Sequence, residues 1–482
     1  MRNDIKGKLG VELGKDIEGE PQVIYILSRI RKILEIDKNK KKNKQGKKPR
    51  KSSLKGVNAY PDAERIKVTH TEYKSGDPCP KCPEGRLYLM ATWGKIIKFL
   101  GSQFLYVIIY LQEKLRCNTC GWIVAAQLPP EALGSKANSE AQAMIALLKY
   151  AAGFPFYRMA TIQKYLKTPT SASSLWLMIA DLIEVVTIIW PRLRYYAAQG
   201  ELLHNDDTTN KILESMKPSK DPNKKTKKTV YTSGILSVLK DGIKIILFFT
   251  GENHAGKNLE NLLLERESSL EKPIHMSDAS SMNDVKAETN KGSCLTHIRR
   301  YFVECYSKYK ADATHFITEV GKVYAIDAET KKLSKEDRLL VHQEKSGPIM
   351  AELYKWMTER LAQNLVEPNS ALGEAIAHAL KHWDKATLFL RIAGAPLSND
   401  ELEQKFKTVK LSVKNAMFYK TQWGALVGDI FMSIIHTTVL ANENPYEYLV
   451  AILDNKTEVL KNPDLWMPWN FRKQIEKSSM VA

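Results

Sequence analysis

The sequence predicts a multidomain α+β protein built around a mixed β-sheet, and three observations support this prediction. Residues 200–300 contain three strand patterns, then a helix pattern, then a fourth strand pattern. Residues 300–394 have almost entirely helical periodicity. Two Cys-x-x-Cys pairs precede both regions, and such pairs are typical of a small zinc-binding module.

Length and charge limit the kinds of protein that this chain can be. Its 482 residues are enough for about three domains, and 44% of them are hydrophobic. Lys and Arg number 72 against 54 Asp and Glu, and the resulting charge of +18 favours a polyanionic partner, above all nucleic acid. No signal-peptide pattern opens the chain, and its apolar stretches are too short and interrupted to span a bilayer. We therefore expect a soluble, cytoplasmic protein with no membrane partner.

The first part of the chain combines an apolar helix pattern with a basic run. Residues 21–36 have apolar positions at helical spacing and predict a short amphipathic helix, a candidate self-association element. Residues 38–51 contain nine Lys or Arg and no acid. Such a run cannot bury a core, so we expect it to be disordered. It is either a solvated linker or a tether to a phosphate backbone.

The two cysteine pairs are Cys79 with Cys82 and Cys117 with Cys120. Each Cys-x-x-Cys turn directs two thiolates toward one point, and four thiolates complete a tetrahedral structural zinc site. The β-rich sequence between the pairs is typical of a zinc ribbon. Six cysteines in a reducing compartment also favour metal ligands or core residues over disulfides. The alternative is four unrelated thiols.

Residues 139–199 predict a series of helices. Within them, residues 161–179 have the order helix, short turn, then a helix that begins after a serine. This order is compatible with a helix-turn-helix that enters a DNA major groove. Ordinary helix packing is the simpler interpretation of the pattern alone, because Leu175 and Trp176 have the character of core residues.

The predicted sheet has the element order of an RNase H-like domain. Strands are expected over residues 201–209, 229–239 and 242–251, a helix over 258–267, and a further strand over 273–280. Such a sheet carries acidic residues at the ends of neighbouring central strands.

Three acidic residues are candidates for one site. Asp206 closes the first strand, Asp278 closes the fourth, and Glu403 lies on a later helix. Three adjacent carboxylates require cations, and two Mg²⁺ ions (or Mn²⁺) held by them would form a phosphoryl-transfer site. For any single aspartate, a role as a turn residue is the simpler alternative.

The helix that carries Glu403 also presents lysines on the same face, at spacings of four, seven and eleven residues. The alternative is a solvated charged face with a Glu–Lys pair. Elsewhere, Cys294 and His297 are expected to pack structurally, and the lysine-rich residues 217–228 are either a basic flap or a solvated loop. The candidate DNA contacts are Lys407, Lys410, Lys414 and Asn415 on the glutamate helix, with Arg299 and Arg300 upstream.

Several motifs together resemble the transposases of the insertion sequence 66 family, which are DDE-type enzymes. The resemblance extends from about Lys55 to the end of the chain. It rests on GVNAYPDAERIKVTH with the four cysteines, KYAAGFPFYRMATIQKYL, HNDDTT, PIHMSDASSMN, CLTHIRRYF, SNDELEQKFKTVKLSVKNAMF, NPYEYLVAIL and MPWNF. Asp207, Gln404 and Val413 depart from the family's usual Glu, Arg and Arg.

The resemblance implies that Asp206, Asp278 and Glu403 are the catalytic acids, with Mg²⁺ (or Mn²⁺) at the catalytic site and structural Zn²⁺ in the cysteine module. It implies a bacterial, nucleoid-associated enzyme that cleaves the ends of its element and joins them to target DNA. Its expected partners are DNA, further copies of the chain and accessory proteins. The alternatives are a catalytically inactive DNA-binding descendant and, less favoured, an RNA-directed nuclease.

The expected organisation places an RNase H-like catalytic core with a helical insertion after a zinc ribbon and a helix-turn-helix-like region. The expected segments are an N-terminal helix region (1–36), a basic linker (37–58), the zinc ribbon (59–130), the helical region (131–199), the first part of the core (200–300), the helical insertion (301–394), the glutamate-bearing part of the core (395–440) and a C-terminal segment (441–482).

Overall fold

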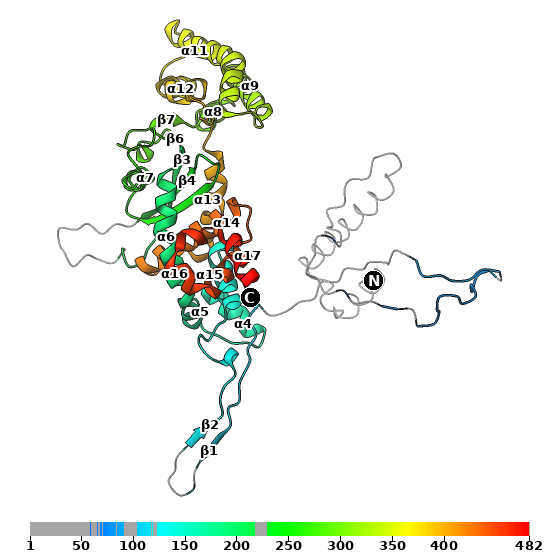
Figure 1. Cartoon of the computed structure of the whole chain (residues 1–482). Helices are drawn as coiled ribbons and strands as arrows, with labels where there is room; N and C mark the ends of the chain where they lie inside the picture. The colour runs from blue at the N-terminus through cyan, green and yellow to red at the C-terminus, as the bar shows by residue number, and fades with distance from the viewer. Residues whose placement is uncertain are drawn as a thin grey trace, which may run out of the picture. The chain divides into compact units, whose positions relative to one another are not determined.

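The structure is a computed structural model, and the chain forms two compact units, Met1–Gly101 and Ser102–Ala482 (Figure 1). The boundary between them falls within the range predicted for the zinc ribbon. The structure describes residues 71–82, 84–90, 104–116, 123–216 and 229–481, with the single positions 58, 65, 68, 69 and 118. The predictions for residues 21–36, 38–51 and 217–228 and for Cys117 and Cys120 lie outside the described residues.

A five-stranded mixed sheet forms the centre of the larger unit, in the order β5-β4-β3-β6-β7. The strand β4 is antiparallel to both β3 and β5, whereas β6 is parallel to both β3 and β7. The predicted α+β class and the predicted strands are confirmed, and β7 is an additional strand. The strands are β3 (Leu202–Asn210), β4 (Val230–Val238), β5 (Lys244–Gly251), β6 (Ile274–Ser277) and β7 (Asn290–Ser293).

Helices precede the sheet, as the sequence predicts. Leu175 is fully buried, and Ser171 caps its helix by accepting a hydrogen bond from the Ser174 N–H (3.0 Å). These helices are α3 (Ser139–Ala146), the π-helix η3 (Leu147–Ala151), α4 (Phe156–Tyr165), α5 (Ala172–Met178) and α6 (Ala180–Ala198). A shorter segment, η2 (Pro130–Ala132), comes before them, and β1 (Lys114–Arg116) pairs with β2 (Ile123–Ala125).

The helix α14 (Gln422–Leu440) covers the edge strand β5 and bonds to it. The outward N–H groups of Ile246 and Phe248 donate to Thr437 Oγ1 (3.1 Å) and Ser433 Oγ (2.9 Å). Residues four apart on the helix therefore bond to residues two apart on the strand. Because these N–H groups are occupied, the strand edge is not open to pairing with another chain.

By length and composition, α14 is the one single helix among the described residues that could cross a membrane, and the bent pair α5–α6 would be a second if it formed one span. Of the apolar window in α14, 67% is buried inside the protein. Its bonds to β5 and this burial are typical of the core helix of a soluble protein.

Asp429 extends the same contact, because its carboxylate accepts the Thr250 N–H and the Thr250 hydroxyl, both at 2.6 Å. The pKa of Asp429 is raised from 3.8 to about 7, because the effect of burial exceeds the opposing effect of the two hydrogen bonds from Thr250. Because the folded-state pKa lies above the unfolded value, the ionised carboxylate costs stability that grows as the pH rises from about 4 and is complete above about 7.

Replacing Asp429 with Asn should therefore stabilise the protein at pH 8 by on the order of 2–4 kcal/mol, since one pKa unit corresponds to about 1.4 kcal/mol. The amide can still accept the Thr250 N–H and can donate to its hydroxyl. Thermal unfolding of both proteins at pH 5 and pH 8 measures the effect. If the difference in unfolding temperature between the variant and wild type is no larger at pH 8 than at pH 5, the prediction is wrong.

A second, separate core fills the helical insertion between β7 and the helix α13 (Asp400–Ala416). Its helices gather at one end of the unit, beyond β6 and β7 (Figure 1). They are α8 (Leu295–Cys305), α9 (Lys310–Glu329), α10 (Lys335–Val341), the π-helix η5 (His342–Ser346), α11 (Gly347–Ala362), α12 (Ala371–Ala386) and η6 (Leu388–Leu390). The Leu295 N–H donates to the Leu397 carbonyl (2.9 Å), so the chain enters and leaves this core at one point.

The remaining helices complete the unit. Along the chain, the helix α7 follows β5 and precedes β6, and the short η4 comes after β6. The C-terminal helices pack on the core that α14 and α6 share. Their bounds are α7 (Ala255–Leu263), η4 (Ser281–Asn283), α15 (Pro445–Asp454), α16 (Lys456–Lys461), η7 (Pro463–Trp466) and α17 (Phe471–Val481).

Candidate active site

The two candidate aspartates belong to neighbouring strands. The sequence predicts Asp206 at the end of its strand, but the residue lies within β3, because pairing with β4 continues to Asn210. Asp278 directly follows β6. The parallel register pairs Leu202 with Ile274 and His204 with Met276. Asp206 and Asp278 each come two residues after the last of these pairs, His204 and Met276. The side chain of Asp278 is held by the turn that follows β6, because its Oδ1 accepts the Ser280 N–H (3.1 Å) and the Asn283 amide. Strand pairing therefore brings together two acids that are far apart in the sequence.

A glycine allows the third acid to reach the same place. Gly234 on β4 pairs directly with Asp206, and the ring of Phe406 from α13 packs over it. A Cβ at Gly234 would lie 2.6–2.7 Å from two ring carbons of Phe406, so only glycine admits this contact. Leu402 and Phe406 are fully buried. Their packing places Glu403 above the strand that carries Asp206.

The charges of the three carboxylates interact. The pKa of Asp206 is raised from 3.8 to about 7, mainly by burial and also by the negative charges of Asp278 and Glu403. A bond from the Asp207 N–H and the positive charge of Lys410 oppose this rise. The three predicted acids are thus within electrostatic reach of one another, and their negative charge favours a bound cation.

Asp207, the neighbour of Asp206, has a structural role. Its carboxylate accepts hydrogen bonds from the Ser233 hydroxyl (2.6 Å) and from the Ala255 N–H at the start of α7 (2.9 Å). It also lies 3.1 Å from His254 Nδ1. A carboxylate with these partners fixes the helix N-terminus to the sheet. Of the two adjacent aspartates, Asp206 is therefore the one whose side chain remains available to a ligand.

A buried polar network lies beneath the acids and ties α13 to the sheet. The side chain of Asn399 donates to the Asn205 carbonyl (3.1 Å), and its Oδ1 lies 2.9 Å from His204 Nδ1. Asn205 in turn contacts His275 Nε2 at 2.9 Å. Burial lowers the pKa of both histidines, that of His275 to about 3, so both rings are neutral.

This network fixes the residue that begins the glutamate helix. The sequence analysis included Asn399 in a motif but assigned it no role. The sequence does place Asn399 directly before the acidic first turn of α13, a position where asparagine often begins a helix.

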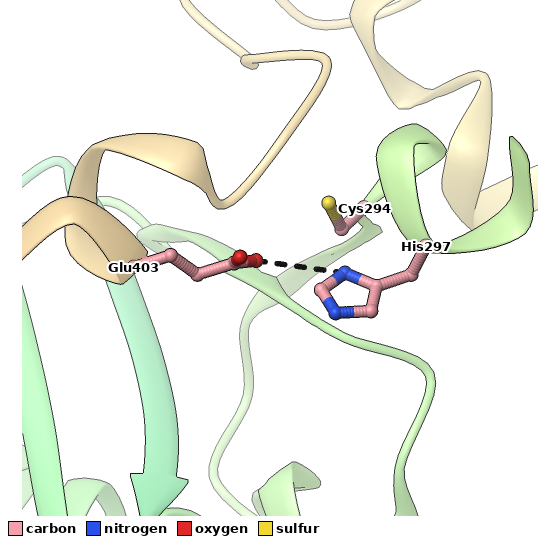
Figure 2. A group of neighbouring side chains, drawn as sticks. All are labelled: Cys294, His297 and Glu403. Atoms are coloured by element: carbon pink, nitrogen blue, oxygen red, sulfur yellow. Dashed lines mark ion pairs between the residues drawn. The ribbon is translucent and has the colours of Figure 1, made fainter. Parts of the chain in front are cut away.

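Glu403 also faces two residues that the sequence analysis assigned to packing. Figure 2 shows the carboxylate directed toward the His297 ring, with the Cys294 thiol beside them. The distance from His297 Nδ1 to Glu403 Oε1 is 3.6 Å. Burial raises the pKa of the Cys294 thiol to about 11. Cys305, a further cysteine on α8, is buried in the core of the insertion. The Cys-x-x-His spacing was visible in the sequence, but its third partner was not.

The predicted DNA contacts divide by position. Lys407, Lys410 and Lys414 of α13 are exposed on the helix face beside its buried stripe, and the positive charge of Lys410 reaches Asp206. Asn415 is half-buried near the end of the helix. Arg299 and Arg300 lie on α8, where Arg299 is half-buried and Arg300 is exposed. Of these residues, Lys410 has the clearest connection to the acids.

A polar cavity of about 210 Å³ adjoins Asp278 on the side of the insertion. Lys291 on β7 and Lys381 and Lys385 on α12 bring positive charge to it, and His382 also lines it. Lys291 also pairs with Asp284 (3.3 Å). The sequence analysis did not identify these lysines, because their common position depends on how α12 packs against the sheet edge.

The fold and the site are those of an α+β protein with a mixed sheet, in which the charges of Asp206 on β3, Asp278 after β6 and Glu403 on a later helix interact. The chain matches the family model described as "Transposase IS66 family" over residues 134–426. It therefore belongs to that family, and the predicted resemblance is confirmed.

The curated relatives cover a smaller part of the chain. The uncharacterized protein y4jD of Sinorhizobium fredii is 28% identical over 183 residues, which are 37% of this chain and 35% of that protein. The uncharacterized protein y4hP of the same organism is 27% identical over 204 residues, 39% of this chain and 36% of that protein. The chain thus spans about a third of the length of these relatives. No solved structure matches.

Proposed function

We propose that this protein is a DNA transposase that binds the terminal inverted repeats of its own insertion sequence, cleaves the DNA ends and transfers the 3′-hydroxyls to target DNA. One observation carries the proposal: in a chain of the IS66 transposase family, Asp206, Asp278 and Glu403 converge from two strands and a helix. The proposed reaction needs no protein nucleophile, because water and then the DNA 3′-oxygen attack phosphorus.

We further propose that the sheet is an RNase H-like catalytic core. The element order of three strands, a helix and a strand supports this, as does the central position of β3 between β4 and β6. The insertion then separates the second acid from the third. The domain division expected from the sequence remains part of the proposal.

The three acids suit Mg²⁺ or Mn²⁺, since both metals prefer hard oxygen ligands. The raised pKa of Asp206 supports this fit, because a bound cation would favour the ionised carboxylate that burial and the charges of Asp278 and Glu403 disfavour. When bound, such ions would activate the attacking oxygen and stabilise the leaving one. The chain itself contributes the carboxylates, the network that orients α13 and the lysines that bind phosphates.

The other parts of the chain are proposed to bind and hold DNA. Around Cys79, the backbone N–H groups of Lys81 and Cys82 lower the pKa of the thiol, which favours the thiolate that zinc binds. The Cys79 N–H donates to the Gly85 carbonyl (2.7 Å) in a tight turn. These features support a zinc ribbon that includes Cys82, Cys117 and Cys120. The helices α4 and α5 are the proposed helix-turn-helix, and Arg299 and Arg300 are proposed phosphate contacts.

Strand-cleavage and strand-transfer assays with DNA that carries the element's ends test the proposed function. Purified protein with Mg²⁺ should nick these ends and join them to a second DNA. Binding without any cleavage would instead identify an inactive DNA-binding descendant. The retention of all three acids disfavours that alternative.

Replacing Lys410 with Ala should slow cleavage about tenfold or more at saturating DNA and weaken DNA binding only slightly. The Lys410 charge reaches Asp206, so the ammonium group is suited to position the phosphate that reacts. Single-turnover cleavage rates measure the effect, with Lys461→Ala on α16 as a control, because Lys461 pairs with Glu458 far along the chain. Equal rates for Lys410→Ala and wild type would show that the lysine face is merely solvated.

A further inference from the structure

Cys294, His297 and Glu403 bring three different metal-binding groups to one point. One ligand atom from each lies within 4.8 Å of the other two (Figure 2). Cys294 comes directly after β7, His297 is in the first turn of α8, and Glu403 is in the first turn of α13. The hydrogen bond between Leu295 and Leu397 holds the beginnings of these two helices together. The cluster is therefore built into the junction between the sheet and the insertion.

Two of the three side chains each have one buried atom that finds no hydrogen-bond partner in the described part of the chain. Among the residues that the structure describes, His297 Nδ1 and Glu403 Oε1 are buried atoms without one. Their separation of 3.6 Å is too long for a hydrogen bond. Buried polar atoms are rarely left unsatisfied, so this pair requires an explanation.

The separation matches that of two ligands on one metal ion. With zinc bonds of about 2.0–2.1 Å to nitrogen and oxygen, tetrahedral geometry places the two ligand atoms roughly 3.3–3.4 Å apart. The observed 3.6 Å needs only a small adjustment. The Cys294 sulfur, within 4.8 Å of both, can close onto the same ion by a small side-chain rotation.

We propose that Cys294, His297 and Glu403 form a binding site for Zn²⁺ that adjoins the three-carboxylate site and shares Glu403 with it. A thiolate, an imidazole and a carboxylate are the ligand types of zinc, whereas Mg²⁺ and Ca²⁺ prefer oxygen ligands. Three protein ligands leave a fourth position open to water or to a phosphate oxygen.

The surroundings of the thiol support this assignment over simple packing. The Asn399 N–H donates to Cys294 Sγ at 3.3 Å, and the His297 N–H donates to the Cys294 carbonyl at 3.2 Å. N–H donors to sulfur stabilise the thiolate form that a metal binds. A plain ion pair between His297 and Glu403 would explain neither the long separation nor the position of the sulfur.

Zinc analysis and calorimetric titration of the full-length protein test the site. Wild type should bind one more zinc ion than Cys294→Ser or His297→Ala, whatever number the cysteine module holds. Each substitution should weaken zinc binding at this site by about a hundredfold or more, because loss of a direct ligand exceeds the 10–100-fold loss seen for outer partners. With Co²⁺ in place of zinc, Cys294→Ser should also remove part of the thiolate-to-metal absorption.

The matched control is Cys305→Ala, since Cys305 is a buried cysteine at the other end of α8 whose Sγ donates to the Phe302 carbonyl. Its zinc content should equal that of wild type. Circular dichroism verifies that each variant is folded, and Glu403→Gln provides a third variant, because its side chain is half-exposed and tolerates the change. Folded variants that all retain the wild-type zinc content and affinity would overturn the proposal.

The test is independent of the proposed transposase activity. Asp206→Asn removes a carboxylate that lies outside the Cys–His–Glu cluster, so its zinc content should remain that of wild type. A protein without cleavage activity but with this zinc site would contradict only the proposed function. An active protein without the site would contradict only the present inference.

Discussion

Replacing Asp206 or Asp278 with Asn, or Glu403 with Gln, is expected to slow DNA cleavage by about a thousandfold or more and to leave binding to the DNA ends nearly unchanged. Each amide removes one negative charge from a site in which three carboxylates interact. Metal-dependent phosphoryl transfer depends on these charges, whereas DNA affinity depends mainly on positive groups elsewhere. Single-turnover cleavage and gel-shift measurements on the same DNA separate the two effects.

Glu401→Gln is the matched control for Glu403→Gln. Both residues are in the first turn of α13, but Glu401 pairs with Lys244 on β5 and takes no part in the carboxylate group. Its cleavage rate should stay close to that of wild type. Cleavage at the wild-type rate by any one of the three acid variants would remove that residue from the catalytic site.

Replacing Gly234 with Val is the second change with a large expected effect. The new Cβ would lie 2.6–2.7 Å from the Phe406 ring, so α13 must move away from β4. Overpacking of this kind costs about 1–3 kcal/mol of stability. Because Glu403 moves with the helix, cleavage should slow by about a hundredfold, which is the cost of misplacing a reacting group by about 1 Å.

Gly251→Ala on β5 is the control for a glycine change within the same sheet. No atom lies within 4 Å of the Cβ that alanine would add there. Thermal unfolding and cleavage rates of the two variants give the comparison. If Gly234→Val cleaves DNA as fast as Gly251→Ala, the contact of Phe406 with β4 does not position Glu403.

The strands β4 and β5 could be predicted from their apolar and β-branched residues, which in β5 form the run Ile245–Phe249. The strand β3 could be predicted from the apolar pair Leu202 and Leu203 at its start. The edge strand β7 could not, since its four residues, Asn-Lys-Gly-Ser, carry no apolar signal and are held by pairing with β6. Local pattern therefore identified the strands that build the core, and long-range pairing determined the rest.

The site divides in the same way. Asp206 and Asp278 could be identified from the sequence, because the predicted strand order places the segments that carry them side by side. The contact of His297 with Glu403 cannot, because it depends on how the insertion returns to the sheet. Gly234 likewise has the appearance of a weak point in a strand until the Phe406 ring is placed above it.

The hydrogen bond between Leu295 and Leu397 has a consequence for how such chains diverge. Because the two ends of the insertion meet, the length of the segment between them does not set the distance from Asp278 to Glu403. Closing a longer loop costs little additional entropy, about 0.6 kcal/mol for each doubling of its length. Lineages of mobile elements can therefore gain, lose or exchange the helices α9 to α12 while the acids on either side keep their spacing.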